Sequence, residues 1–406
     1  MRGGRDPLRI LVVVQFLPYP PQQGFALRVH YLVRELARHH RVTILAYDAP
    51  GHVGAARHYE AAGIEVRLVS LATLDTPGWA RKLRALASRH SHRWHDRHRP
   101  AMQAALDAVL AERRHDLVQI ESPEFWRYRY ATSAPVYLDA HNIWYELRAR
   151  AIDLRRGLIR QAYQRFDNAK ARREEHAAWR RLDGCLVTSE REARVVRGKR
   201  ARRVVVVPNG VDPGYLQPSE ALAAPDALVF TGLMAYRPNS DAVRWFVADI
   251  LPRILAERPD AHLTVVGKDV PRKVLELAGP SVTITGSVPD IRPHLGRAAV
   301  VIVPLRAGSG TRIKILEALS MGRAVVSTTV GAEGLEVRSG EHLVLADTAE
   351  DFARAVTRLL ADPAETARLG SAGRQLIERS YAWARIAADL SRHYGSVVAV
   401  RAPDRP

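Results

Sequence analysis

Short apolar segments recur along the whole chain, and longer segments of mixed polarity separate them. In the first half of the chain these segments are Leu8–Phe16, Arg41–Tyr47, Glu65–Leu71, Asp116–Ile120, Val136–Ala140, Cys185–Ser189 and Val204–Val207. In the second half they are Leu228–Thr231, His262–Val266, Val282–Gly286, Ala299–Pro304, Ala324–Thr328 and His342–Ala346. Nearly continuous apolar runs are typical of strands in parallel sheets, which are buried on both faces. Their alternation with helical segments predicts an α/β protein.

Several segments between these strands have the spacing of amphipathic helices. In Gly24–His39, Leu27 and Tyr31 lie one turn apart, as do Leu32 and Leu36. A further helix is predicted over 381–400, at the end of the chain. Because 406 residues exceed one ordinary core, two domains are expected.

Turn-forming residues mark the boundary between the two series of strands. Pro208 begins a stretch rich in proline and alanine that ends near Asp226. We predict four parts: an N-terminal doubly wound domain over 1–207, a linker over 208–225, a second doubly wound domain over 226–384, and a C-terminal helix over 385–406 that returns to the first domain. Doubly wound sheets bind ligands at the carboxyl ends of their strands.

The chain is strongly basic. Its 61 lysines and arginines exceed its 43 aspartates and glutamates, which gives a formal net charge of +18. This excess suits an anionic lipid surface, an anionic substrate or nucleic acid, and also an arginine-rich genome. No aromatic stacking platform or groove-reading motif accompanies the charge, so no nucleic acid is expected as a partner. The segment Arg89–Arg99, with Trp94, is interpreted as a solvated basic helix, a lipid contact, or a nucleic-acid or metal site.

Cysteine content and apolar stretch length bear on the compartment. Cys185 is the only cysteine and lies in an apolar run, and a lone buried thiol fits a reducing cytoplasm. No stretch approaches the ~18 uninterrupted apolar residues of a membrane-spanning helix. We expect a cytoplasmic protein, with peripheral contact at the inner face of an anionic membrane as a further expectation.

The segment Pro304–Gly322 carries most of the candidate chemistry. It follows the apolar run Ala298–Val303 and consists of a small-residue loop and an amphipathic helix. Free backbone N–H groups at such a helix start attract phosphate. Arg312 and Lys314 add positive charge there, and Glu317 is placed to accept hydrogen bonds from a sugar diol. Phosphate binders and a diol acceptor on one unit predict a nucleotide-sugar site.

Several motifs of the second half occur in the order and spacing of a known family. They are Pro208–Asp212, Phe230–Gly232, Val265–Gly267, Thr285–Val288, Gly308–Gly322 and Ala324–Leu335. Through these motifs the chain resembles the retaining glycosyltransferases of family 4 over nearly all of residues 204–385. In the first half the resemblance rests on Pro18–Arg28, Arg41–Leu45, Asp139–Asn142, and Glu174 or Glu175. It implies the GT-B fold, in which two Rossmann-like domains face a central cleft.

The resemblance assigns roles in the second domain. Glu317 matches the glutamate that binds the ribose diol, and Arg312 and Lys314 are expected near the diphosphate. Ser309 stands where the family has another glutamate, and Leu233 stands where it has an arginine. Backbone N–H groups of the loop are therefore expected near the donor sugar. The other expected donor-site residues are Gly232, Arg237, Lys268, Val288, Gly310 and Thr311.

The resemblance also assigns roles in the first domain. Gly24 matches one of two family glycines near the donor phosphate, and Phe25 replaces the other. His141 matches the active-site histidine beside the reacting sugar, and Asp139 and Asn142 are further candidates. The catalytic residues that the resemblance implies are His141, Arg312 and Lys314. It also implies a reaction without a protein nucleophile, in which a donor phosphate oxygen receives the acceptor's proton.

Together these features predict a retaining glycosyltransferase that uses a UDP- or GDP-linked sugar in glycan, glycolipid or exopolysaccharide biosynthesis. The expected acceptor is a saccharide, a lipid-linked molecule or a small molecule. No cofactor and no metal are expected, because helix ends and basic side chains neutralise the diphosphate in this fold. Three alternatives stay open: a soluble natural-product glycosyltransferase, a non-catalytic sugar-nucleotide-binding protein, suggested by Ser309, Leu233 and Phe25, and a basic nucleic-acid-binding protein.

Overall fold

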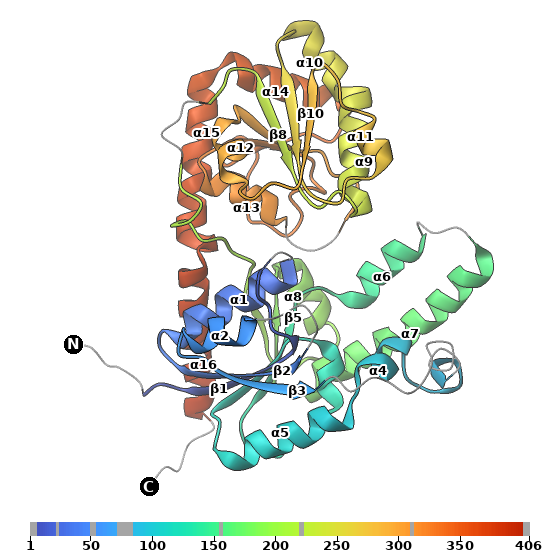
Figure 1. Cartoon of the computed structure of the whole chain (residues 1–406), viewed down its shortest axis with the longest axis vertical. Coiled ribbons are helices and arrows are strands. Elements are labelled where there is room, and N and C mark those ends of the chain that lie inside the picture. The colour runs from blue at the N-terminus through green and yellow to red at the C-terminus, as the bar shows by residue number, and fades with distance from the viewer. Residues whose placement is uncertain are drawn as a thin grey trace. The chain divides into compact units, whose positions relative to one another are not determined.

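The chain forms two compact units in the computed structural model (Figure 1). The structure describes residues 6–21, 24–48, 54–70, 84–153, 157–218, 223–308 and 312–400. The N-terminal unit contains Met1–Pro208 and Ile386–Pro406, and the C-terminal unit contains Asn209–Arg385.

A seven-stranded parallel sheet forms the centre of the N-terminal unit, with strand order β3-β2-β1-β4-β5-β6-β7. Its strands are β1 (Arg9–Phe16), β2 (Arg41–Asp48), β3 (Glu65–Ser70), β4 (Leu117–Ile120), β5 (Val136–Ala140), β6 (Gly184–Val187) and β7 (Val204–Val206). Its helices are α1 (Gly24–Ala37), α2 (Ala55–Glu60), α4 (His92–Arg97), α5 (Pro100–Glu112), the short 3-10 helix η1 (Pro123–Arg127), α6 (Trp144–Asp153), α7 (Leu158–Arg181), α8 (Glu190–Arg197) and α16 (Trp383–Val400). The strand order reverses between β1 and β4, which makes their carboxyl ends the expected ligand-binding edge.

The two faces of this sheet have different neighbours. Val118 and Leu138 belong to an apolar cluster with residues of α5 and α7. Because successive strand residues point to opposite faces, Gln119 and Asp139 lie on the other face. The C-terminal helix α16 packs there, and its Tyr394 hydroxyl donates a hydrogen bond to Gln119 Oε1 over 2.6 Å.

A six-stranded parallel sheet forms the centre of the C-terminal unit, with strand order β10-β9-β8-β11-β12-β13. Its strands are β8 (Ala227–Thr231), β9 (His262–Val266), β10 (Val282–Gly286), β11 (Val300–Val303), β12 (Ala324–Ser327) and β13 (Val344–Leu345). Its helices are α9 (Arg237–Trp245), α10 (Leu251–Glu257), α11 (Arg272–Leu275), α12 (Arg292–Arg297), α13 (Ile313–Ser320), α14 (Ala349–Ala361) and α15 (Pro363–Leu376), with the π-helical turns η2 (Phe246–Ile250) and η3 (Ile377–Tyr381). The order reverses between β8 and β11, so this unit is doubly wound as well.

The prediction of two doubly wound parallel-sheet domains is confirmed, and the arrangement is the GT-B fold. All sheet pairings in both units are parallel, as the near-continuous apolar runs predict.

Candidate functional site

Loops at the carboxyl ends of β8 and β9 form the first candidate site, in the C-terminal unit. Gly232 follows β8 and Gly267 follows β9, and a Cβ atom on Gly267 would collide with the Gly232 carbonyl oxygen. A Cβ atom on Gly232 would lie 2.9 Å from Lys314 Nζ. Glycine at both positions therefore allows two loops and one lysine side chain to approach closely.

Two neighbours hold the ammonium group of Lys314. Its Nζ donates a hydrogen bond to Asn239 Oδ1 over 2.9 Å and lies 3.9 Å from the centre of the Phe230 ring. Burial, followed by the charge of Arg312, lowers the pKa of Lys314 to about 7. Near neutral pH this lysine therefore exchanges its proton readily, and an arriving phosphate dianion favours the charged form.

Glu317 lies on the same helix, α13, and is partly buried rather than solvated. Burial raises the pKa of Glu317 to about 7, and the charge of Lys314 opposes this rise. Titratable groups with strongly shifted pKa values concentrate at functional sites. The pair Lys314 and Glu317 therefore marks this edge of the sheet as the candidate nucleotide site.

Arg312 immediately precedes α13 and is 6% exposed. Its Nη2 donates to the Val330 carbonyl oxygen over 3.5 Å, and a Cβ atom on Gly308 would lie 2.8 Å from the same nitrogen. Arg312 is thus packed between two loops and is not an ordinary surface charge. The predicted neighbours Ser309, Gly310 and Thr311 lie outside the described residues.

The remaining predicted donor-site residues are spread over this edge. Arg237 is exposed at the first residue of α9, so it is not part of the buried cluster around Lys314. The Lys268 carbonyl oxygen accepts a hydrogen bond from Met234 N over 3.0 Å, and Val288 packs partly buried against the core. Asn239, which holds Lys314, was not assigned a role by sequence reasoning.

The second candidate site lies in the N-terminal unit, after β4 and β5. His141 follows β5 and is 7% exposed, and its Nε2 lies 2.8 Å from Glu121 Oε2. Burial, followed by the charge of Asp139, raises the pKa of Glu121. The Phe25 ring packs on the imidazole with ring centres 4.8 Å apart. Sequence reasoning missed Glu121, although polar residues alternate with apolar ones in the buried segment 117–121.

A buried ion pair lies beside His141. Arg28, on α1, donates to both carboxylate oxygens of Asp139 over 2.9 to 3.1 Å, and both side chains are almost fully buried. Arg28 also donates to the carbonyl oxygens of Val207 and Pro208 over 2.7 and 3.1 Å. Asp139 is therefore an ion-pair partner rather than an available sugar ligand. Gly24 is exposed at the first residue of α1, and Asn142 is partly buried after His141.

Glu121, Asp139 and His141 could also be read as a metal site. Each offers one ligand atom, and these atoms lie within 4.8 Å of one another. The Arg28 guanidinium binds both oxygens of Asp139, so it supplies the positive charge that a cation would bring. We assign the three residues to a hydrogen-bonded ion-pair network.

Glu175 fixes the helix that follows His141. Its two carboxylate oxygens accept hydrogen bonds from the backbone N–H groups of Trp144 and Tyr145, over 3.0 and 3.2 Å, at the start of α6. Burial raises the pKa of Glu175 to about 8, and these two hydrogen bonds oppose the rise. The neighbouring Glu174 instead accepts from Ser91 N and Oγ, over 3.1 and 2.6 Å.

The basic segment Arg89–Arg99 packs in part against its neighbours. Ser91 is buried, and Trp94 stacks on His98 with ring centres 4.8 Å apart. The ring of His98 in turn stacks on Tyr128 at 4.6 Å. The segment is therefore only partly solvated: Arg89 is exposed, whereas the rings of Trp94 and His98 stack in a row that reaches Tyr128.

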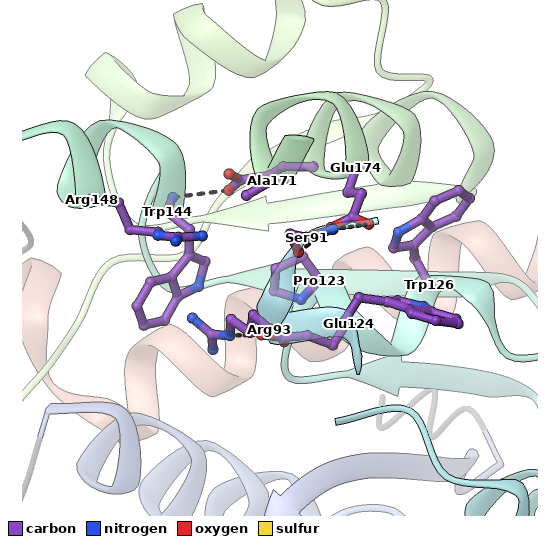
Figure 2. Close-up of a pocket in the computed structure, with 11 residues that line it drawn as sticks. Ser91, Arg93, Pro123, Glu124, Trp126, Trp144, Arg148, Ala171 and Glu174 are labelled. Carbon is purple, nitrogen blue, oxygen red and sulfur yellow. Dashed lines mark hydrogen bonds and ion pairs between the residues drawn. The ribbon is translucent and has the colours of Figure 1, made fainter. Parts of the chain in front are cut away.

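Two hollows adjoin this segment. The first, of about 30 Å³, is nearly filled by its own side chains, with the Arg93 guanidinium 4.1 Å from the centre of the Trp144 ring (Figure 2). The second is an open groove of about 580 Å³ that shares Trp94 and Trp126 with the first. Its lining consists of Trp94, His98, Trp126, Arg127, Tyr128, Ala177 and Arg181.

Among the described residues, no helix is both long and apolar enough to cross a membrane.

Two family models match the chain. The model described as "Glycosyltransferase Family 4" matches residues 23–215, and the model described as "Glycosyl transferases group 1" matches residues 225–362. The matches fall on the two parallel-sheet units, one on each.

Individual curated proteins resemble parts of the chain at sequence identities of 26% to 29%. The D-inositol 3-phosphate glycosyltransferase of Stackebrandtia nassauensis is 29% identical over 224 residues, which cover 49% of this chain and 50% of that protein. The chain therefore spans half the length of this relative, and it spans 35% and 38% of two further curated proteins.

Two solved structures share the fold over nearly the whole chain. Sucrose-phosphate synthase from Thermosynechococcus elongatus has a TM-score of 0.70 at 19% identity, covering 98% of this chain and all of that one. HepE from Anabaena, solved in complex with UDP and glucose, has a TM-score of 0.66 at 14% identity, covering 96% of this chain and all of that one.

Proposed function

This chain belongs to glycosyltransferase family 4, and we propose that it transfers a sugar from a nucleoside-diphosphate sugar to an acceptor hydroxyl with retention of configuration. The observation that carries the proposal is the cluster of Arg312, Lys314 and Glu317 at the carboxyl edge of the C-terminal sheet. The complex of HepE with UDP and glucose supports a UDP-linked donor by analogy of fold.

The three clustered side chains divide the work on the donor. Arg312 and Lys314 neutralise the diphosphate, which gains negative charge as it leaves the sugar. Lys314 is suited to this task because its lowered pKa allows it to take up a proton when the diphosphate binds. Glu317 accepts hydrogen bonds from the ribose diol through its carboxylate. Gly232, Lys268 and Val288 line the nucleotide.

The proposed reaction needs no protein nucleophile. The acceptor oxygen forms a bond to the anomeric carbon on the face from which the diphosphate departs, and the bond from that carbon to the phosphate oxygen breaks. The acceptor's proton passes to a phosphate oxygen of the leaving nucleoside diphosphate. The protein contributes position and electrostatic stabilisation, and His141 is the catalytic side chain that we assign to the N-terminal unit.

The acceptor is an anionic saccharide that contacts the aromatic groove of the N-terminal unit. Arg127 and Arg181 flank Trp126, with guanidinium carbons 4.6 and 5.3 Å from ring centres of the indole. Within the described residues, neither arginine forms a salt bridge with a carboxylate, although the charge of Glu174 acts on Arg127 and, more weakly and with opposite sign, so does that of Arg181. A carboxylate or phosphate group of the acceptor would neutralise this pair. The name of the inositol-phosphate relative agrees with a charged acceptor.

The cellular setting follows from these assignments. A basic surface with unpaired arginines suits work at the inner face of an anionic membrane, on a lipid-linked or polymeric acceptor in glycan, glycolipid or exopolysaccharide biosynthesis.

Release of nucleoside diphosphate from UDP- and GDP-sugars tests the proposed activity. We expect one donor class to be turned over by the wild type, and Glu317→Gln and His141→Ala to lower turnover by at least about tenfold. Glu257→Gln is the matched control, because Glu257 is exposed at the end of α10. Binding of a donor without any turnover would instead support the non-catalytic alternative.

The acceptor assignment is tested by titrating tryptophan fluorescence with tetragalacturonate and with neutral maltotetraose. Arg181→Gln should weaken binding of the anionic oligosaccharide, whereas Arg180→Gln should not, because Arg180 is exposed on the same helix but does not line the groove. Equal affinity for the two oligosaccharides, or equal effects of the two variants, contradicts the assignment.

A further inference from the structure

A chain of buried hydrogen bonds connects the C-terminal helix α16 to His141. The Tyr394 hydroxyl donates to Gln119 Oε1 over 2.6 Å, and Gln119 Nε2 donates to Glu121 Oε1 over 2.5 Å. The other oxygen of Glu121, Oε2, lies 2.8 Å from His141 Nε2. Tyr394, Gln119 and Glu121 are each at most 1% exposed.

The strand geometry explains why these side chains meet. β4 and β5 are parallel neighbours, with Gln119 opposite Tyr137. Side chains two residues apart on a strand share a face, so Glu121 lies beyond Gln119 on the same face, and His141 lies beyond Asp139. Tyr394 covers this face from α16. Gln119 and Glu121 are thereby held in one row with His141 and with Tyr394 of the C-terminal helix.

The direction of the hydrogen bonds in this row favours a proton on His141 Nε2. Tyr394 and Gln119 both donate toward Glu121, which favours the ionised carboxylate as the final acceptor. An ionised Glu121 accepts from His141 Nε2–H. The other ring nitrogen, Nδ1, is buried and has no hydrogen-bond partner among the described residues. A buried polar atom of this kind is costly unless a ligand satisfies it.

Burial and the charge of Asp139 raise the pKa of Glu121, whereas the hydrogen bond and charge of His141 and, last, the charge of Arg28 oppose this rise. Asp139 is the acidic side chain that acts most strongly on Glu121. The Arg28 guanidinium offsets the charge of Asp139, because it donates hydrogen bonds to both of its carboxylate oxygens. The guanidinium of Arg28 also favours the ionised form of Glu121. Phe25 is the side chain in ring contact with the imidazole and is only partly buried, so it is able to yield to a ligand.

We propose that Glu121, oriented by Gln119 and Tyr394, is a positioning residue that keeps the His141 proton on Nε2 and presents Nδ1 as the acceptor for a hydroxyl group of a sugar substrate. A carboxylate that fixes the tautomer of an active-site histidine is a recurring device in enzymes. The sugar as the ligand of Nδ1 rests on the proposed function, whereas the position of the proton does not.

The test combines a spectroscopic and a kinetic measurement on the full chain. In protein labelled with ¹⁵N-histidine, the His141 signals are identified by their loss in His141→Gln, and long-range ¹H–¹⁵N correlations report which ring nitrogen carries the proton. We expect the Nε2–H form in the wild type. In Glu121→Gln the share of this form should fall, and kcat should fall by about 10- to 100-fold with a smaller change in the donor KM.

Tyr394→Phe provides a second variant, which removes one hydroxyl at the far end of the row. It should shift the same His141 signals and lower kcat, both by less than Glu121→Gln does. The matched control is Tyr381→Phe, because the Tyr381 hydroxyl is also buried and accepts from Glu336 N over 2.7 Å in the other unit. This control should leave the His141 signals unchanged.

Each outcome decides the proposal. A wild-type His141 that carries its proton on Nδ1 overturns it, and so does a folded Glu121→Gln protein with the wild-type tautomer and kcat. If the wild type turns over no sugar nucleotide, the proposed function fails, but the tautomer measurement still decides whether Glu121 positions His141.

Discussion

Lys314 and Glu317 lie three residues apart on α13, and the pKa values of both are close to 7 although their ordinary values differ by six units. Burial is the main cause in each case, since it disfavours the charged form of either group. Near pH 7 each of the two side chains is therefore only partly protonated, so a bound nucleotide is able to change the number of protons that the pair holds.

Proton exchange on nucleotide binding should change sign near pH 7. At pH 8 Glu317 is mostly ionised and Lys314 mostly neutral, so a bound diphosphate draws a proton onto Lys314 and binding takes up protons. At pH 6 Lys314 is already charged and Glu317 is protonated, so a ribose diol that binds the carboxylate drives proton release. Calorimetric titration with UDP or GDP in buffers of different ionisation enthalpy measures both.

Two variants separate the contributions to this exchange. Lys314→Met should abolish proton uptake at pH 8 and keep the release at pH 6, whereas Glu317→Gln should do the reverse. Proton exchange that is independent of pH, or unaffected by both variants, would show that these groups do not contact the nucleotide.

Asn239 should matter for nucleotide binding only through Lys314. Asn239→Ala removes the acceptor that holds Nζ, and we expect UDP or GDP affinity to fall by about 3- to 10-fold, the worth of one ordinary hydrogen bond. In a double-mutant cycle, Asn239→Ala should have little effect in a Lys314→Met background. Additive losses would mean that Asn239 acts independently of Lys314.

Burial of Glu175 should make the stability of the N-terminal unit depend on pH. Its pKa is about 8 in the folded protein and near 4.5 when unfolded, so the folded state favours the protonated form. Glu175 therefore contributes less to stability as the pH rises from 4.5 through 8. The melting temperature of the wild type relative to Glu175→Gln should fall as the pH is raised from 5 to 9.

Glu336→Gln is the control for this pH series, because Glu336 is exposed in the C-terminal unit. A constant difference between wild type and Glu175→Gln across the series would mean that Glu175 is ionised throughout and acts only as a helix cap.

Much of the fold follows from the sequence because the apolar runs are local signals. Val300–Val303 and its neighbours in the sheet are identifiable without knowing what they contact, and the helix with Glu317 follows directly from its loop. The partners of the site residues are not local. Asn239 meets Lys314 across 75 positions, and Arg28 meets Asp139 across 111.

The alternation of polar and apolar residues along the fourth strand segment indicates part of the second site. Gln119 and Glu121 are polar residues at alternate positions of a buried strand, which indicates a hydrogen-bonded row on one face. The histidine-rich segment 89–99 has the polar composition of a solvated helix, and the sequence does not show which element covers it. Its histidine and tryptophan rings stack on one another and on Tyr128.

Removing one partner of the ion pair between Arg28 and Asp139 should lower the free energy of unfolding. Arg28→Met leaves the Asp139 carboxylate buried without its partner, and we expect the free energy of unfolding of the N-terminal unit to fall by about 3–5 kcal/mol. The double variant Arg28→Met with Asp139→Asn should be more stable than the single variant, because no charge is left buried. Denaturant unfolding measures both, and a double variant less stable than Arg28→Met would contradict this reasoning.

The central claim is that the edge of the C-terminal sheet around Lys314 and Glu317 binds a nucleoside-diphosphate sugar. Isothermal titration of the wild type, Glu317→Gln and Glu257→Gln with UDP-, GDP-, ADP- and dTDP-sugars tests this directly. We expect one donor class to bind the wild type and Glu257→Gln equally and to bind Glu317→Gln at least about tenfold more weakly. Absence of binding by every sugar nucleotide, or equal binding by all three proteins, would contradict it.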